Sequence, residues 1–249
     1  RIEYNDNNFE QVIEYCKTVT QDYPNIADGH LFLFRSYNNL HKFESAIPSL
    51  EALLEIAPND LDTLQALIKI YYNLKHLEKV IQYAKITLQH HPKDKQSYLF
   101  LFKALYSLKK FESAIIPLEA LLDITPKDLD VLLPLIRINY NLKRHDKVIE
   151  YAKITIQEHP KVREGHLFLF KSLHSQRDFE SAIAPLEALL KLDANDLDAL
   201  LALIRIHYNL KNHHEVIQYA KTTIQQYPKV RDGHLFMARP SMVFGKNQQ

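Results

Sequence analysis

Apolar residues recur along this chain with the three-and-four spacing that is typical of one face of an α-helix. The segment 61–74, LDTLQALIKIYYNL, shows this spacing, and so does the segment 77–89, LEKVIQYAKITLQ. Only a short polar stretch separates the two segments. The pattern therefore predicts two consecutive helices joined by a tight turn, which together form a helical hairpin.

The hairpin pattern is repeated along the sequence. The motif FESAIPSLEALL begins at Phe43, and close copies begin at Phe111 and Phe179, so this motif returns after 68 residues. A second motif, YNLKHLEKVIQYAK, returns at the same interval and lies half a period from the first. The repeating unit is therefore 34 residues long, and two variants of it alternate. The equivalent points in successive units are Phe9, Phe43, Leu77, Phe111, His145, Phe179 and His213.

Proline and aspartate mark the ends of the predicted helices. A proline closes nearly every unit, and an acidic residue such as Asp60, Asp128 or Asp196 follows where the next helix should begin. The closing prolines are Pro24, Pro58, Pro92, Pro126, Pro160 and Pro228, with Ala194 as the exception. Pro48, Pro117, Pro134 and Pro185 lie inside predicted helices. Each should bend its helix unless that helix begins later.

These features resemble the tetratricopeptide repeat family, whose 34-residue helix-turn-helix unit carries a small residue at position 20 and proline at position 32. With Pro58 as position 32, position 20 is Ala or Val in every copy. The chain departs from the family at position 8, where Phe and Ile alternate in place of a small residue. The resemblance implies an all-α, right-handed α-solenoid over residues 1–236. Its parts are a partial unit at 1–26, full units that begin at residues 27, 61, 95, 129, 163 and 197, and a partial unit from 231.

Neither end of the sequence coincides with the end of a complete repeat unit. Residues 1–5 match the end of a first helix, so we expect the chain to be a piece of a longer protein. The segment 237–249, MARPSMVFGKNQQ, leaves the pattern at Pro240 and is interpreted as a divergent tail, cap or linker.

Composition limits the classes of function. Lys and Arg number 31 against 30 Asp and Glu, so the whole molecule has no charge excess that would attract nucleic acid or an anionic membrane. The absence of a long apolar run argues against membrane insertion. A single cysteine, Cys16, excludes an internal disulfide and fits a reducing compartment, although periplasmic proteins can also lack disulfides; the localisation stays open, with the cytoplasm favoured.

The sequence offers no pattern of catalytic residues. Three of the four glycines, Gly29, Gly165 and Gly233, occupy one repeat position, so no phosphate-binding loop is visible. Most of the 13 histidines also follow the repeat, which predicts structural or surface roles and no metal site. Cys16 is expected to be a buried apolar residue. We therefore expect a protein without enzymatic activity, cofactor or metal.

Columns of equivalent side chains are where a repeat protein is expected to bind. At about 100° per residue, positions 2, 9 and 13 of the first helix share one solvent face, and position 12 lies beside them. Position 9 is basic in every full unit: Arg35, Lys69, Lys103, Arg137, Lys171 and Arg205. Position 13 supplies Asn39, Asn73, Asn141 and Asn209, and position 12 supplies Tyr72, Tyr106, Tyr140 and Tyr208.

The family resemblance implies that these first helices line a concave groove that binds peptides. Basic side chains can bind carboxylates, Asn can pair with a peptide backbone, and Tyr offers apolar area with a polar tip. The predicted ligand is an extended, acidic or carboxylate-ended peptide. An alternative for the charges is pairing with the mostly acidic residues at position 2, and an alternative for the Asn column is a helix-end role.

The sequence leaves four functions open for this chain. The leading hypothesis is a non-catalytic scaffold or adaptor that binds a protein or peptide partner. A second is the substrate-recognition segment of a larger modifying enzyme such as a glycosyltransferase, because the ends of the chain are incomplete. RNA binding is ranked lower, since the acidic residues at position 2 and the near-neutral charge oppose it. Self-association through an exposed end or the 237–249 segment is a further alternative.

Overall fold

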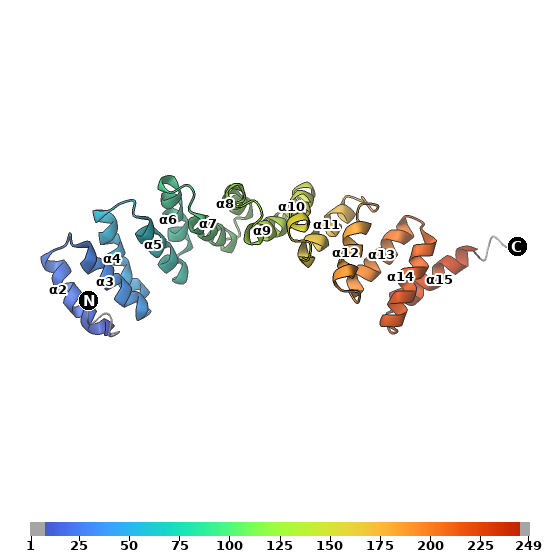
Figure 1. The fold of residues 1–249 in the computed structure, drawn as a ribbon, viewed down its shortest axis with the longest axis horizontal. Coiled ribbons are helices and arrows are strands. Elements are labelled where there is room, and N and C mark those ends of the chain that lie inside the picture. Colours follow the sequence, from blue (N-terminus) through green and yellow to red (C-terminus); the bar gives the residue numbers. More distant parts are fainter. Residues whose placement is uncertain (1–7, 245–249) are drawn as a thin grey trace. The chain divides into compact units, whose positions relative to one another are not determined.

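The computed structural model describes residues 8–244, with side chains described for residues 8–237. This part of the chain forms fourteen α-helices and no strand (Figure 1). The helices are α2 (Phe9–Asp22), α3 (Ala27–Asn39), α4 (Phe43–Ile56), α5 (Leu61–Asn73), α6 (Leu77–His90), α7 (Lys95–Ser107), α8 (Phe111–Ile124), α9 (Leu129–Asn141), α10 (His145–Glu158), α11 (Arg163–Ser175), α12 (Ile183–Leu192), α13 (Leu197–Asn209), α14 (His213–Gln226) and α15 (Arg231–Phe244).

The odd-numbered helices from α3 to α15 are the first helices of successive repeats, and each begins 34 residues after the previous one. Aspartates cap several of them as the sequence indicates. The Asp60 carboxylate accepts a hydrogen bond from the backbone N–H of Thr63 at 2.9 Å, and Asp196 accepts one from Ala199 at 3.0 Å. Such caps satisfy N–H groups that have no partner within the helix.

The turn inside each hairpin has one recurring backbone geometry. A non-glycine residue with positive φ follows the first helix, and the next N–H bonds to a carbonyl five residues earlier, as Arg144 does to Asn139 at 2.9 Å. This is the Schellman pattern of helix ends, in which glycine is the preferred residue. The residues with positive φ are His41, Lys75, Lys109, Lys143, Arg177 and Lys211.

Within each unit, the core runs between the helices of each hairpin and between neighbouring hairpins. Position 20, which the sequence predicts to be small, is buried in every described copy, as at Ala46 and Val80. Leucine and isoleucine from the first helices, such as Leu67 and Ile136, are fully buried beside it. Cys16 is also buried, in a cluster with Val12, as the sequence predicts.

Prolines inside the helices have two outcomes. Pro48, Pro117 and Pro134 lie within α4, α8 and α9, which continue through them. Helix α12 instead begins at Ile183, four residues later in the repeat than α8 does, so Pro185 falls in its first turn. A proline there loses no intrahelical hydrogen bond, because the N–H groups of the first turn have no partner within the helix. Helix α15 ends at Phe244, so it includes Pro240 and the first part of the segment 237–249. Residues 245–249 of that segment lie outside the described part of the chain.

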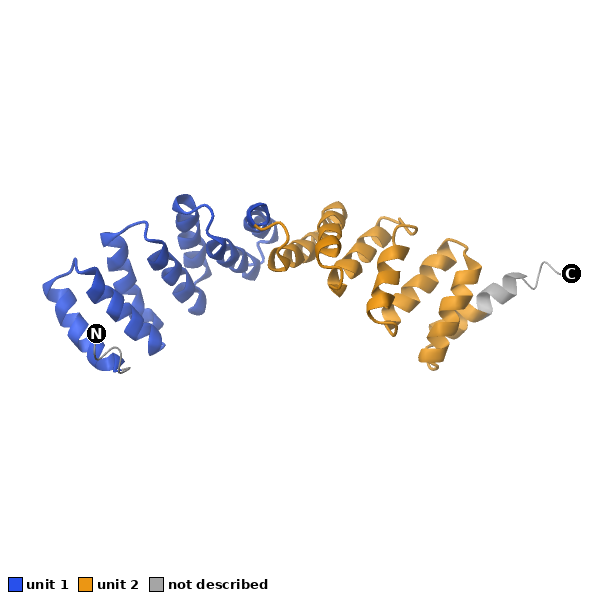
Figure 2. Ribbon diagram, viewed as in Figure 1, with its two compact units in different colours: residues 1–124 blue, residues 125–249 orange. Residues whose placement is uncertain are grey.

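The chain divides into two compact units, residues 1–124 and 125–249, coloured separately in Figure 2. Unit 1 contains α2 to α8, and unit 2 contains α9 to α15. Within each unit, every helix packs on the next one in sequence. None of the helices in residues 8–244 combines the length and apolar character that crossing a bilayer requires.

A buried histidine in unit 2 gives a first testable prediction. The His207 ring stacks on Tyr219 with centroids 5.6 Å apart, and its Nδ1 accepts a hydrogen bond from the Asn212 amide at 3.3 Å. Burial lowers the pKa of His207, an effect that the nearby carboxylates of Glu215 and Glu187 only partly oppose. The unfolded chain therefore binds a proton on this histidine at a higher pH than the folded protein does.

This difference should make unit 2 less stable below about pH 6.5, the ordinary pKa of histidine, with a slope of at most about 1.4 kcal/mol per pH unit. The contribution of His207 is fully present above that pH and is lost as the pH falls towards its folded pKa. In His207→Asn, which copies the buried Asn139 of α9, this dependence should disappear from urea unfolding curves. The control His214→Asn, on the surface of α14, should keep it; equal curves for both variants would contradict the assignment.

Candidate functional site

The predicted binding side chains lie on the first helices, mostly at the surface. Among the six basic residues at position 9, Lys171 is half-buried and the others are exposed. All four asparagines at position 13 are exposed. Tyr72 and Tyr140 are half-buried, whereas Tyr106 and Tyr208 are 41% and 39% exposed. Most of the three columns is therefore accessible to a ligand.

In unit 2 the arginines of the basic column bind acids of the following repeat. Arg137 of α9 forms a two-pronged ion pair with Glu164 of α11, with Nη2 2.7 Å from Oε2. Arg205 of α13 pairs with Asp232 of α15 at 2.7 Å. For these two arginines, the structure selects the pairing between position 9 and position 2 that the sequence left open. Their charge is thus largely balanced within the protein.

Three of the four tyrosines of position 12 also contact the following repeat, whereas Tyr106 contacts Phe102 and Phe111 of its own hairpin. In unit 1, the Tyr72 ring meets Phe100 edge-to-face with centroids 5.2 Å apart. In unit 2, Tyr140 meets Phe168 at 5.0 Å and Tyr208 meets Phe236 at 5.3 Å. Each phenylalanine occupies position 6 of the next first helix. We call the three places where such a pair closes the space between first helices, α5/α7, α9/α11 and α13/α15, the filled junctions.

Lysines of the basic column lie over these same rings. Lys103 Nζ is 5.8 Å from the centre of Phe100, and Lys171 Nζ is 5.4 Å from Phe168 and 5.9 Å from Tyr140. These are cation–π distances. Positions 6, 9 and 12 of neighbouring first helices therefore form one cluster at the filled junctions α5/α7 and α9/α11.

The asparagine column has a mixed role. The Asn39 amide donates a hydrogen bond to the Arg35 carbonyl at 2.9 Å, which is a helix-end role. Asn73, Asn141 and Asn209 form no side-chain hydrogen bond within the described residues and are exposed. These three amides keep both donor and acceptor available to a ligand.

Unit 1 differs from unit 2 in the state of its basic column. Arg35 and Lys69 are exposed and form no ion pair with any described residue. Lys69 has no acid to bind on the next first helix, because position 2 of α7 is Gln96. Lys103 lies over the Phe100 ring and forms no ion pair with a described residue. The basic column of unit 1 therefore forms no ion pair with a described carboxylate.

The space between α3 and α5 is not closed in the manner of the filled junctions. Helix α5 packs directly on α7, whereas no comparable packing joins α3 to α5. The residues at positions 12 and 6 are here Asn38 and Ala66, so no aromatic pair can form. We call this place the open junction.

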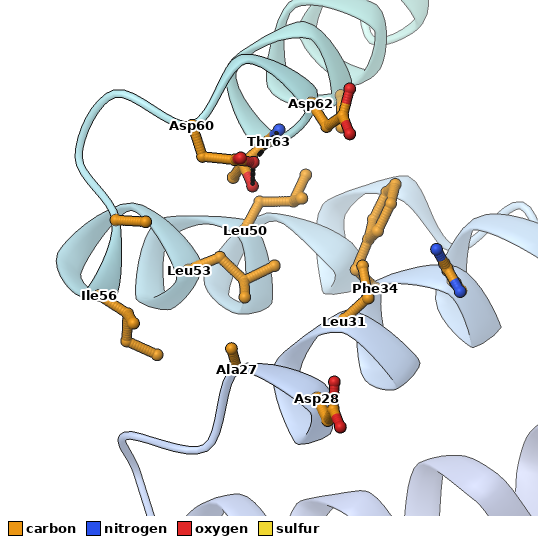
Figure 3. Close-up of a pocket in the computed structure, with 13 residues that line it drawn as sticks. Ala27, Asp28, Leu31, Phe34, Leu50, Leu53, Ile56, Asp60, Asp62 and Thr63 are labelled. Atoms are coloured by element: carbon orange, nitrogen blue, oxygen red, sulfur yellow. Dashed lines mark hydrogen bonds between the residues drawn. The ribbon is translucent and has the colours of Figure 1, made fainter. Parts of the chain in front are cut away.

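A cavity of about 470 Å³ lies at the open junction, between α3, α4 and α5. Leu31 and Phe34 of α3 and Leu50 and Leu53 of α4 give it apolar walls (Figure 3). Ala66 of α5 also lines it. Asp28, Arg35, Asp60 and Asp62 supply the charged part of the lining. The volume is within the range of about 300–1,000 Å³ that is typical of small-ligand pockets.

Histidines of the repeat have structural partners. The Nε2–H groups of His30, His166 and His234 donate to the carbonyls of Pro24, Pro160 and Pro228 at 2.8 to 2.9 Å. These bonds join the start of a first helix to the preceding turn. Within the described part of the chain, no group of three or more His, Cys, Asp or Glu side chains is placed to hold a metal ion.

Position 6 is the feature that the sequence reasoning missed. It reads Phe32, Ala66, Phe100, Pro134, Phe168, Ala202 and Phe236 in successive first helices. Phenylalanine thus appears in every second unit, always after a unit with tyrosine at position 12, and alanine or proline stands between. This alternation is visible in the sequence and is the signal for junctions with and without an aromatic pair.

Comparisons with known proteins agree with this architecture. Residues 169–230 match the tetratricopeptide repeat family. A tetratricopeptide repeat protein from Cytophaga hutchinsonii, solved as its C-terminal part, has a TM-score of 0.64 and 16% identity, with 95% of this chain and 97% of that one covered. YrrB, a tetratricopeptide repeat protein with an unusual peptide-binding site, has a TM-score of 0.59 and 12% identity, with 74% and 95% covered.

A chain of the Naa15/Naa10 complex bound to HypK-THB has a TM-score of 0.71 and 14% identity, and the match covers 96% of this chain and 37% of that one. No curated protein sequence matches. At identities of 12%, 16% and 14%, the solved structures are evidence for the fold alone. Residues 169–230 thus match the tetratricopeptide repeat family, and the repeated hairpins of the described residues have the fold of tetratricopeptide repeat proteins.

Proposed function

We propose that the protein is a non-catalytic scaffold and that the first helices of unit 1 bind an extended peptide bearing carboxylates. The observation that carries this proposal is the basic column of α3, α5 and α7, which forms no ion pair with a described residue. Arg35, Lys69 and Lys103 have no ion pair among the described residues, and Lys103 lies over the Phe100 ring. Exposed cations without partners can bind a carboxylate without first breaking an internal pair.

The amide and aromatic groups beside these cations suit a peptide backbone. Asn73 is exposed and has no side-chain partner among the described residues, so it can both donate to and accept from a main chain. Tyr72 is half-buried against Phe100 and offers an apolar surface next to it. The peptide-binding site of YrrB is a precedent for this class of ligand on the same fold.

Unit 2 provides an internal comparison for the proposal. Its arginines at position 9, Arg137 and Arg205, are already paired with Glu164 and Asp232. A peptide carboxylate would have to compete with these acids. We therefore expect unit 1 to be the preferred site for acidic peptides.

The proposal predicts which variants lose peptide binding. We expect the full chain to select acidic peptides from a synthetic library of acidic, neutral and basic sequences. The triple variant Arg35→Ala/Lys69→Ala/Lys103→Ala should weaken that binding about tenfold or more, as three exposed ion pairs of up to about 1 kcal/mol each would allow. Fluorescence polarisation with the selected peptides at low salt measures the effect.

The matched control is Arg137→Ala/Lys171→Ala/Arg205→Ala, which removes the same net charge from unit 2. It should retain most of the affinity if the partnerless cations of unit 1 form the site. If both triple variants lost the same peptide affinity, net charge and not a site on unit 1 would explain the effect. Selection of basic or neutral peptides would overturn the proposal.

A further inference from the structure

The filled junctions show what the open junction lacks. At α5/α7, Phe100 reaches into the space between the two first helices and contacts Tyr72. Phe168 and Phe236 fill the corresponding spaces in unit 2. At the open junction the residue in the position of Phe100 is Ala66, which lines the cavity. The protein therefore supplies its own phenylalanine in these three junctions and leaves a cavity at the open junction.

The α11/α13 junction also has alanine at position 6, Ala202, but a different side chain bridges it. Arg163, the first residue of α11, reaches the Asp196 carboxylate that caps α13, with Nη2 2.7 Å from Oδ2. At the open junction the residue in the position of Arg163 is Ala27, and the residue in the position of Asp196 is Asp60. Both line the cavity. The open junction thus lacks this bridge as well as the aromatic pair.

The cavity walls suit an aromatic side chain. The Phe34 ring is half-buried and forms no ring pair with a described residue, whereas Phe102 and Phe170, its equivalents, contact Tyr106 and His174 at 5.7 Å. Leu50 and Leu53 complete an apolar wall on α4 (Figure 3). A ring inserted from outside would gain the aromatic contact that Asn38 cannot provide.

The charged side chains at the cavity indicate which ligand group should lie next to the aromatic ring. Three carboxylates, Asp28, Asp60 and Asp62, and one guanidinium, Arg35, line the cavity. Asp60 caps α5 through Thr63, whereas Asp28 on α3 and Asp62 on α5 are exposed and have no partner among the described residues. The lining of the cavity is thus net acidic, so a cation next to the ring would be attracted.

We propose that the open junction is an anchor pocket for an aromatic side chain of a bound peptide, with a basic group next to that aromatic residue. This deepens the proposed function and rests on it for the ligand being a peptide. The carboxylates of the same peptide would then lie farther along unit 1, at Lys69 and Lys103. Position 2 is an aspartate on α3 and α5 but is Gln96 on α7. The exposed side chains of the first helices therefore become more positive from α3 towards α7.

The test uses small molecules that carry only the anchor chemistry. L-Phenylalaninamide has a phenyl ring next to an ammonium group, glycinamide has only the ammonium group, and N-acetylphenylalanine has the ring next to a carboxylate. In methyl NMR of the full chain, phenylalaninamide should shift the signals of Leu31, Leu50 and Leu53. Glycinamide should leave them unchanged, and N-acetylphenylalanine should bind about fivefold more weakly, a difference of the size expected for one exposed charge contact.

Two sets of variants separate the ring from the charge. Asn38→Tyr/Ala66→Phe installs the aromatic pair of the filled junctions and should abolish the shifts. Asp28→Asn/Asp62→Asn changes only exposed carboxylates; it should retain binding of the ring and remove the preference for phenylalaninamide over N-acetylphenylalanine. Methyl shifts that persist in Asn38→Tyr/Ala66→Phe, if that variant folds, would overturn the pocket assignment.

If Asn38→Tyr/Ala66→Phe does not fold, Asp28→Asn/Asp62→Asn still tests the proposed pocket. Equal binding of glycinamide, or an unchanged preference in Asp28→Asn/Asp62→Asn, would overturn the proposal. The variant Lys69→Ala/Lys103→Ala separates it from the proposed function, because these lysines do not line the cavity. This variant should bind phenylalaninamide normally even though it loses acidic peptides. Loss of phenylalaninamide binding there would count against an independent anchor pocket.

Discussion

Replacing Lys143, Arg177 and Lys211 together by glycine is expected to raise the free energy of unfolding of unit 2 by about 2 kcal/mol, after the entropy cost of glycine in the unfolded chain is subtracted. These residues follow α9, α11 and α13 and have φ angles of 58°, 62° and 62°. A Cβ atom in this left-handed region approaches the following carbonyl oxygen and costs about 1 kcal/mol or more per residue, which glycine avoids. The three turns lie in different hairpins, so their gains should add.

Urea unfolding monitored by circular dichroism measures this gain. The control Lys143→Ala/Arg177→Ala/Lys211→Ala removes the same side chains and charge but keeps each Cβ, so it should bring no comparable gain. A stabilisation of equal size in both variants would show that charge at the turns, and not backbone geometry, is responsible. A loss of stability in the glycine variant would mean that the greater freedom of glycine in the unfolded chain outweighs the relief of strain.

Most of the fold could be predicted because several local signals coincide at each repeat. Apolar spacing, the position-20 Ala or Val, the closing proline and the capping aspartate all point to the same hairpin, and the structure has each of them in place. Helix α12 is the local exception. Its late start could not be read from the sequence, because α8 has proline at the same repeat position and continues through it. In the late-starting copy, the Asp178 carboxylate binds the Ser181 N–H at 3.1 Å in a local turn, and such bonds compete with helix formation.

The candidate site was predicted less completely for a physical reason. Periodicity correctly places Arg137 and Arg205 on an exposed face, but their pairing depends on the distance between neighbouring first helices. That distance depends on the side chains that fill each junction, such as Phe168, which lies outside the columns at positions 9, 12 and 13. The cavity at Ala66 could not be predicted from one column either, because it results from the absence of an aromatic residue both at position 12 of α3 and at position 6 of α5. Single columns carry no such information, whereas pairs of columns at positions 6 and 12 do.

Removing the aromatic pair of a filled junction is expected to have the other large effect. In Phe168→Ala, unit 2 should lose about 2 kcal/mol of stability, less than the roughly 3–5 kcal/mol of a fully buried phenylalanine because this ring is half-buried. The change removes the contact with Tyr140 and the ring beneath Lys171. Urea unfolding measures the loss, and Phe168→Leu, which keeps much of the apolar volume, should lose less.

The comparison that decides the cause is with the ion pair at the same junction. Arg137 is 53% exposed and its pair with Glu164 should contribute about 1 kcal/mol or less, so Arg137→Ala should cost less than Phe168→Ala. The opposite order would mean that charge pairing closes the junction and that the aromatic pair merely occupies space. If the aromatic pair is responsible, Phe168→Ala also makes α9/α11 resemble the open junction. Phenylalaninamide should then bind at a second place and restore part of the lost stability, because a ligand that binds only the folded state stabilises it.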